Sequence, residues 1–292
     1  MFQVNSSSSF FHKIIDYAGF FPPSQLPIEE AFKNFLAYQN QINHEMLYRF
    51  ICPIAHLQTI YDLSMKQDVF NIPIIVVGSS QEIENQMHWM SMHRDRLSFS
   101  SAETKFDYHH KTLKSVLKLI NNDINLDMVF LEPNIEFIDS KLISFLDDLS
   151  KHSSFGLKVR CGGALAQSIP SIQLLSNLFI LCADRNISLK FTAGLHHALR
   201  HINHNNTMEH GFINMFLSSM LAFSGQKDKD LISKILDCQD KQKFIFTDEG
   251  IKFENVQIST KKIIKARKRV ISFGSCDFIQ PINDLKDMEI IL

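Results

Sequence analysis

Short apolar runs that end in glycine, proline or a charged residue alternate with longer segments in which apolar residues recur at helical spacing. This alternation predicts strands at Leu47–Pro53, Ile72–Gly78, Leu97–Thr104, Met128–Glu132, Gly156–Arg160, Ile187–Ala193 and Val270–Phe273. Helices are predicted between them, at His56–Lys66, Gln81–His93, His110–Asn121, Phe137–Ser150, Ser171–Asp184, Lys229–Asp237 and Thr260–Lys268. Repeated strand–helix units indicate a parallel sheet covered by helices.

Two later segments are less clear. The apolar stretch Phe212–Phe223 fits a helix or a buried strand, because periodicity alone does not separate the two. The segment Phe244–Ile258 alternates over short stretches around an Asp-Glu-Gly turn, which is typical of a hairpin.

The first part of the chain is predicted to be helical. A short helix is expected near Phe10–Tyr17, and a second begins at Pro27, where Glu29 and Glu30 suit the positive end of a helix dipole. We therefore expect residues 1–42 to form a helical cap on a barrel at residues 43–292, all within one domain of residues 1–292.

Seven or eight strand–helix units in 292 residues favour a (β/α)8 TIM-type barrel over an open doubly wound sheet, and leave open how regular the barrel is. No GxGxxG follows the first strand, which counts against a dinucleotide-binding fold. A hydrophobic content of 45% suffices for one large core.

Net charge and cysteine spacing limit the expected binding partners and cellular location of the protein. The formal net charge of −1 gives no general attraction to nucleic acid or membranes. The sequence contains no apolar run of about 18 residues, so no transmembrane helix is predicted. The first residues do not resemble a signal peptide. The five cysteines are widely spaced, which fits a cytoplasmic protein with free thiols. A homo-oligomer is left open.

Strand alternation brings charged side chains into the barrel interior. On two strands Lys158 and Arg160, and Lys190 and Thr192, lie on the face opposite the apolar residues, and Glu132 ends a third strand. Barrel enzymes carry their chemistry at these strand ends. A lysine whose pKa is lowered by burial and by a second lysine can form a Schiff base.

This arrangement suggests a division of roles. Lys190 would be the nucleophile, Lys158 would lower its pKa, Glu132 or a histidine such as His196 or His197 would move protons, and Arg160 would bind an acid group. The alternative is a buried ion network that only fills the barrel.

Other candidates for substrate binding follow strands. Two glycine turns fit close approach to a ligand or simply tight turns; the candidates in and near them are Gly162, Gly163, Gly274 and Ser275. Cys161 and Cys276, in the same turns, are small packed residues or nucleophiles. The loop that begins at Asp16 either folds over the mouth of the barrel or packs as a terminal cap.

Five histidines lie within fifteen residues, at positions 196, 197, 201, 204 and 210. On a helix, His197, His201 and His204 would share one face with zinc-ligand spacing. A second hypothesis is therefore a metal-dependent hydrolase or lyase that binds Zn, Mn or Fe. Its candidate ligands are His196, His197, His210 and either Glu132 or Glu103. The histidines could equally bind an anion without metal or be structural. Arg200 and Asn214, on either side of His210, are further candidates for substrate binding.

Several motifs, spread over nearly the whole chain, together resemble a family of uncharacterised bacterial proteins. They are Asp-Tyr-Ala-Gly-Phe-Phe-Pro-Pro (Asp16–Pro23), Arg49-Phe50 with Pro53, Lys-Xaa-Arg-Xaa-Gly-Gly (Lys158–Gly163), Lys-Xaa-Thr-Ala-Gly-Leu-His-His (Lys190–His197), His-Gly-Phe-Xaa-Asn (His210–Asn214) and Phe-Gly-Ser-Cys-Xaa-Phe (Phe273–Phe278). The chain departs from the pattern at Ala198, where a proline is usual, and His201 and His204 lie outside the pattern. The resemblance supports the choice of site residues and implies no activity.

A shorter resemblance concerns the segment Leu189–Gly194, which is similar to the lysine-bearing strand of class I aldolases of the deoxyribose-phosphate type. Together with the lysines inside the barrel, it favours lyase or aldolase chemistry on a small carbonyl or carboxylate compound, and no cofactor is expected. This is the first hypothesis for function. The metal-dependent enzyme is the second, and a non-catalytic barrel that binds a ligand or serves as a scaffold is the third.

Overall fold

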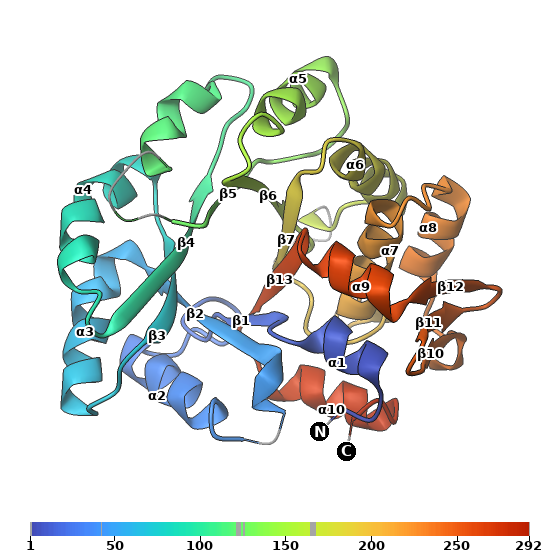
Figure 1. Cartoon of the computed structure of the whole chain (residues 1–292), viewed down its shortest axis with the longest axis horizontal. Helices are drawn as coiled ribbons and strands as arrows, with labels where there is room; N and C mark the ends of the chain where they lie inside the picture. Colours follow the sequence, from blue (N-terminus) through green and yellow to red (C-terminus); the bar gives the residue numbers. More distant parts are fainter. Residues whose placement is uncertain (1, 42, 121–123, 125, 164–167, 292) are drawn as a thin grey trace.

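The computed structural model describes residues 2–41, 43–120, 124, 126–163 and 168–291. Eight parallel strands close a barrel in the order β1-β13-β7-β6-β5-β4-β3-β2, with helices around it (Figure 1). The strands are β1 (Ile15–Tyr17), β2 (Leu47–Pro53), β3 (Ile72–Val77), β4 (Leu97–Lys105), β5 (Met128–Glu132), β6 (Phe155–Arg160), β7 (Ser188–Thr192) and β13 (Val270–Ser275). The predicted (β/α)8 TIM-type barrel is confirmed.

The N-terminal part differs from the prediction. Helix α1 (Asn5–Phe11) ends early, and Lys13, with a φ of 51°, lies in the left-handed region that interrupts a helix. Ile15–Tyr17 then forms strand β1, which pairs with β13 and β2 and closes the barrel. The helix predicted through Tyr17 is therefore wrong there, and the barrel begins inside the segment predicted as a cap. A strand of three residues is too short to show an alternation of its own.

The outer layer consists of helices. They are α2 (Ile28–Tyr38), α3 (Leu57–Lys66), α4 (Ser80–Met92), α5 (Ser140–Leu149), α6 (Ile172–Asp184), α7 (Phe212–Phe223), α8 (Lys229–Asp237), α9 (Thr260–Arg267) and α10 (Ile279–Asp287). Short 3-10 helices are η1 (His44–Met46), η2 (Ile54–His56), η3 (Leu113–Leu119) and η5 (Lys241–Lys243). The helix predicted at His110–Asn121 is the 3-10 helix η3, and Asn121 itself lies outside the described residues. Helix α10 was not predicted.

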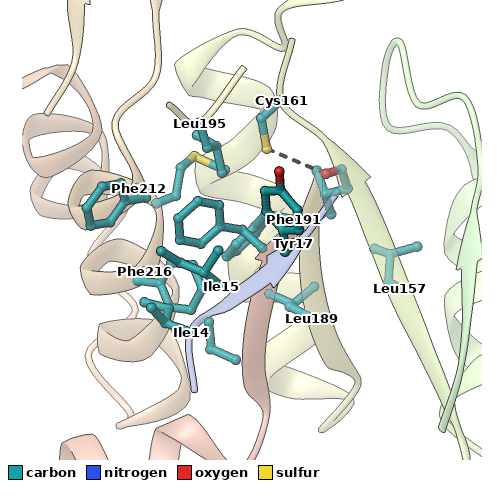
Figure 2. Packing of buried hydrophobic residues seen from close by; sticks show 14 of the residues in the cluster. Ile14, Ile15, Tyr17, Leu157, Cys161, Leu189, Phe191, Leu195, Phe212 and Phe216 are labelled. Atoms are coloured by element: carbon teal, nitrogen blue, oxygen red, sulfur yellow. Dashed lines mark hydrogen bonds between the residues drawn. The ribbon is translucent and has the colours of Figure 1, made fainter. Parts of the chain in front are cut away.

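Helix α7 explains why its segment was ambiguous. All its residues from Phe212 to Ala222 are buried, so it has no solvent-exposed polar face that would distinguish a helix from a buried strand. The ring of Phe212 stacks on Phe273 of β13, and Phe216 meets Phe191 of β7, each with ring centroids 5.2 Å apart. Figure 2 shows this outer layer, in which side chains of the barrel strands point toward α7.

Two small antiparallel sheets lie outside the barrel. Strands β10 (Phe244–Phe246), β11 (Gly250–Phe253) and β12 (Val256–Ser259) confirm the hairpin signal and lie beside α8 and α9 (Figure 1). Strands β8 (His201–Ile202) and β9 (Met208–Glu209) pair with each other. Because His201 lies in a strand and His204 in the turn after it, the helical zinc face predicted for His197, His201 and His204 does not form.

Candidate active site

The barrel interior is lined with charged and polar side chains. Asp16 comes from β1, Arg49 from β2, and Ser101 and Glu103 from β4, all of them buried. The remaining strands contribute Glu132 from β5, Lys158 and Arg160 from β6, Lys190 and Thr192 from β7, and Ser272 from β13. Charged groups are almost never buried without partners, so their pairing decides what this interior can do.

At the most buried end, Asp16 is surrounded by donors. Arg49 binds its carboxylate with two hydrogen bonds, Nε to Oδ1 at 2.9 Å and Nη2 to Oδ2 at 3.0 Å. Lys190 and Ser272 also donate to Oδ2, and Arg49 Nη1 donates to Ser101 Oγ at 2.7 Å. Burial raises the pKa of Asp16, but the charges and hydrogen bonds of Arg49 and Lys190 outweigh it and bring the pKa to about 2.

The two lysines follow in the same chain of ion pairs. Lys190 is fully buried and lies 3.2 Å from Glu103 Oε1. Lys158 Nζ lies 2.6 Å from Glu103 Oε2 and 2.8 Å from Glu132 Oε2. The expectation that neighbouring lysines lower each other's pKa therefore does not suit this geometry, because a carboxylate lies between the two amines. Burial lowers the pKa of Lys158, but Glu103 and Glu132 outweigh it and raise the pKa above its ordinary value.

Arg160 forms the exposed end. Its Nη2 lies 3.0 Å from Glu132 Oε1, and 47% of its side chain is exposed, against 0% for Lys190. Burial raises the pKa of Glu132, but Lys158 and Arg160 lower it below its ordinary value. The ion pairs thus form one series of alternating sign: Arg49, Asp16, Lys190, Glu103, Lys158, Glu132 and Arg160. We call it the ion-pair chain.

We use "mouth" for the C-terminal ends of the barrel strands and the loops that follow them. Apolar side chains gather near the ends of β1, β2 and β3. Ala18, Ile51 and Ile75 form a small buried cluster, against which Phe21 and Val77 pack in partly buried positions. A Cβ atom on Gly274 would lie 3.2 Å from Ile51 Cδ1, so the glycine keeps this region free of a further side chain. Charged groups therefore lie at the ends of β5 and β6, and apolar side chains lie near the ends of β1 to β3.

The predicted glycine turns have a packing role. A Cβ atom on Gly162 would lie 2.8 Å from the Cα of Gly194, so the loops after β6 and β7 touch by their backbones. Gly194 has a φ of 70°, which an L side chain rarely adopts. A Cβ atom on Gly163 would meet Ser168 at 2.9 Å. Substrate binding by these glycines and by Thr192 and Ser275 stays a prediction.

Arg200, His210 and Asn214 are engaged elsewhere. The Asn214 amide donates to the carbonyls of Ile235 (2.6 Å) and Cys238 (2.8 Å) and accepts from the Arg200 backbone N–H at 2.8 Å. The Arg200 side chain pairs with Asp237 at 3.1 Å. His210 contacts the Pro170 carbonyl at 2.8 Å, and burial lowers its pKa to about 4. These contacts tie α7 to α8 and lend no support to substrate binding by Arg200 or Asn214.

The histidines of the metal hypothesis have separate partners. His197 lies 3.0 Å from Asp284, His196 is 3.9 Å from the Cys276 sulfur, and His210 is engaged as described. Within the described residues, no group of three or more histidine, cysteine, aspartate or glutamate side chains is placed to hold a metal ion. The second hypothesis gains no support from this geometry.

Sequence reasoning missed Arg49 as a site residue and named Glu103 only as a metal ligand. Arg49 was detectable, because it is the charged residue within the otherwise apolar Leu47–Pro53 run. Glu103 was harder to find, since the pairing register of β4 with β3 shifts between Phe99 and Ser101. Such a bulge exchanges inward and outward positions, so simple alternation along β4 fails.

Comparison with known proteins adds no family. A scan with protein-family models finds no match to this chain. A search among curated proteins also finds no match. No helix of the described residues has the length and apolar character to span a bilayer. A (β/α)8 barrel is compatible with an enzyme but hosts many unrelated chemistries, so function has to be argued from the site.

Proposed function

We propose that this protein is an enzyme that acts on a small carbonyl or carboxylate compound at the mouth of the barrel, by lyase or aldolase-type chemistry through a lysine amine. The observation that supports this most is the ion-pair chain, which runs from fully buried groups to the half-exposed Arg160. Barrel interiors are ordinarily filled by branched apolar side chains. Ionised groups in such a place cost desolvation energy, which favours a functional reason for them.

The reacting lysine in this proposal is Lys158 rather than Lys190. Lys190 has no exposed surface and lies between Asp16 and Glu103. A substrate would have to displace the most buried residues of the ion-pair chain to reach it. Lys158 is 8% exposed and shares Glu132 with Arg160 at the open end. Lys190 would then be a positioning residue that holds Glu103 in place.

The contacts suggest an order of steps. An acid group of the substrate pairs with the Arg160 guanidinium. Glu132, 2.8 Å from Lys158 Nζ, accepts a proton from the ammonium group. The neutral amine adds to the substrate carbonyl carbon, Glu132 returns the proton to the hydroxyl of the carbinolamine, and loss of water gives an iminium ion. Its positive charge replaces that of the ammonium group between Glu103 and Glu132, so the electrostatic balance of the chain is kept.

The iminium ion accepts the electron pair of the carbon–carbon bond that breaks, and the other fragment leaves as an aldehyde whose hydroxyl proton passes to solvent. The enamine that remains takes a proton at carbon, and hydrolysis of the resulting imine releases the product and restores the amine. The apolar side chains near the ends of β1 to β3, with Phe21 and Val77 partly buried, would contact the hydrocarbon part of the substrate. The carboxylates raise the pKa of Lys158 and so keep its amine protonated near pH 7. The neutral fraction of the amine therefore increases with pH, and imine formation should be faster in alkaline solution.

Borohydride trapping tests this proposal. The protein is incubated with short aldehydes and 2-oxo acids at pH 7 and pH 9, reduced, and mapped by peptide mass spectrometry. We expect a stable adduct on Lys158, formed faster at pH 9 and absent in Lys158→Met. Lys151→Met, which removes an exposed lysine paired with Asp148, should leave the adduct unchanged. Circular dichroism of each variant checks that it is folded.

Two results would overturn the assignment. An adduct on Lys190 would restore Lys190 as the nucleophile. No adduct from any compound, together with binding of a carboxylate seen by calorimetry, would favour a non-catalytic barrel that binds a small acid. Both lysines are paired with carboxylates, and this pairing favours the second function, a non-catalytic barrel that binds a small acid.

A further inference from the structure

A cysteine and a histidine meet at the mouth, outside the ion-pair chain. Cys276 directly follows β13, and His196 lies in the loop after β7, the strand that neighbours β13 in the barrel. The Cys276 sulfur lies 3.9 Å from His196 Nδ1, within reach of a hydrogen bond to sulfur. Cys276 is 6% exposed, and His196 is partly exposed. The steps proposed above use neither side chain.

The backbone around Cys276 is fixed by the loop after β1. The Ala18 N–H donates to the Ser275 carbonyl at 2.7 Å, and the Ser24 hydroxyl donates to the Cys276 carbonyl at 3.3 Å. Three of the sequence motifs therefore converge here: Asp-Tyr-Ala-Gly-Phe-Phe-Pro-Pro, Gly-Leu-His-His and Phe-Gly-Ser-Cys. A sulfur held by neighbours on two loops is positioned for reaction, whereas a surface cysteine on a mobile loop is not.

The surroundings of Cys276 differ from those of the other cysteines. Burial raises the pKa of Cys276, but hydrogen bonds from His196 and Ser24 outweigh it and leave the pKa below its ordinary value. The contact with Cys276 raises the pKa of His196. Burial raises the pKa of the other four thiols, including the more exposed Cys238. Other titratable groups that act on the pair are Tyr17, Glu209 and Asp277.

We propose that Cys276 and His196 form a second reactive site at the mouth, a thiolate–imidazolium pair that adds to small aldehydes. The thiolate attacks the carbonyl carbon, a carbon–sulfur bond forms, and the π electrons move to the carbonyl oxygen. His196 gives its proton to that oxygen, so the product is a neutral hemithioacetal and no oxidant or reductant is consumed. Loss of the adduct reverses each transfer.

Alkylation of the native protein by iodoacetamide tests the pair. Mass spectrometry follows all five cysteines in one sample at pH 6 to pH 9, so Cys238 serves as the internal control for exposure. At pH 6.5 we expect Cys276 to react about tenfold faster than Cys238, because the thiolate is the reactive form. Glycolaldehyde added beforehand should slow the alkylation of Cys276 and leave that of Cys238 unchanged.

Substitution of the histidine separates activation from exposure. His196→Gln should slow alkylation of Cys276 about tenfold at pH 6.5 and less at pH 9, where an ordinary thiol also ionises. His197→Gln is the matched control, because His197 bonds Asp284 instead. An unchanged rate in His196→Gln, a Cys276 rate no higher than that of Cys238, or no effect of glycolaldehyde would overturn the proposal. Because the readout is at sulfur, failure of borohydride trapping at Lys158 is a separate result.

Discussion

Asp16 is the residue on which the polar interior depends most, since Arg49, Lys190 and Ser272 all donate to its carboxylate. The sequence predicts that Asp16 begins a loop which folds over the mouth or packs as a terminal cap. The structure instead places it in β1, a strand of three residues that is too short to recognise. Lys158 and Lys190 were easier, because each alternates with buried apolar neighbours on a longer strand. Asn214 was predicted to bind substrate, but its amide instead donates to backbone carbonyls at the end of α8. A polar residue within an apolar run can have this structural role.

Replacement of this carboxylate should be severe. Asp16→Asn keeps the shape but leaves Arg49 and Lys190 without their counter-charge, and removal of one partner from a buried pair costs about 3–5 kcal/mol. Urea unfolding followed by circular dichroism measures the loss. Asp107→Asn is the control, because its partnership with His110 is exposed and its midpoint should not move. An unchanged midpoint for Asp16→Asn would mean that the remaining groups compensate for one another.

At the scale of elements, predictions succeeded where a residue marks the boundary of a segment, as Pro53 does for β2, Glu132 for β5 and Asp228 for α8. Strands β2 and β5 and helix α8 occur at the predicted bounds. The predictions left α7 open between helix and strand, because it is buried all round, and they found β4 but could not place its Glu103, because the pairing register shifts within that strand. Packing between the loops after β6 and β7 could not be predicted, because the presence of a glycine in the sequence does not identify the backbone segment that packs against it.

That loop contact can be tested with two glycines of positive φ. Gly194→Ala should lower the free energy of unfolding by more than the roughly 1–2 kcal/mol of a strained conformation, since the new Cβ would also lie 2.9 Å from Gly162 Cα. Gly225→Ala, with a φ of 92° and nothing within 4 Å, should show the strain alone. Thermal unfolding compares them, and equal losses would show that the loops separate freely.

At the scale of the whole molecule, the ion-pair chain makes stability depend on pH. The pKa of Asp16 is depressed to about 2, so its stabilisation is present above its ordinary value near 3.8 and is lost as pH falls toward 2. Linkage gives roughly 2 kcal/mol for this group. Urea midpoints at pH 5, 4, 3 and 2 should fall steeply for the native protein and less steeply for Asp16→Asn. Parallel curves would exclude Asp16 as the source.

Closure of the barrel by pairing of β1 with β13 also affects the rate and order of folding. The contact between Asp16 and Ser272 joins positions 256 residues apart, so β1, the shortest strand of the barrel, pairs with its second neighbour only after nearly the whole polypeptide is available. Contacts of such long range slow folding, because loop closure must precede the gain in energy. As the chain is synthesised, strands β2 to β7 can associate while Lys158, Lys190 and Glu103 still face water. We expect the lumen to be dehydrated in the last folding step, when both ends of the sheet meet.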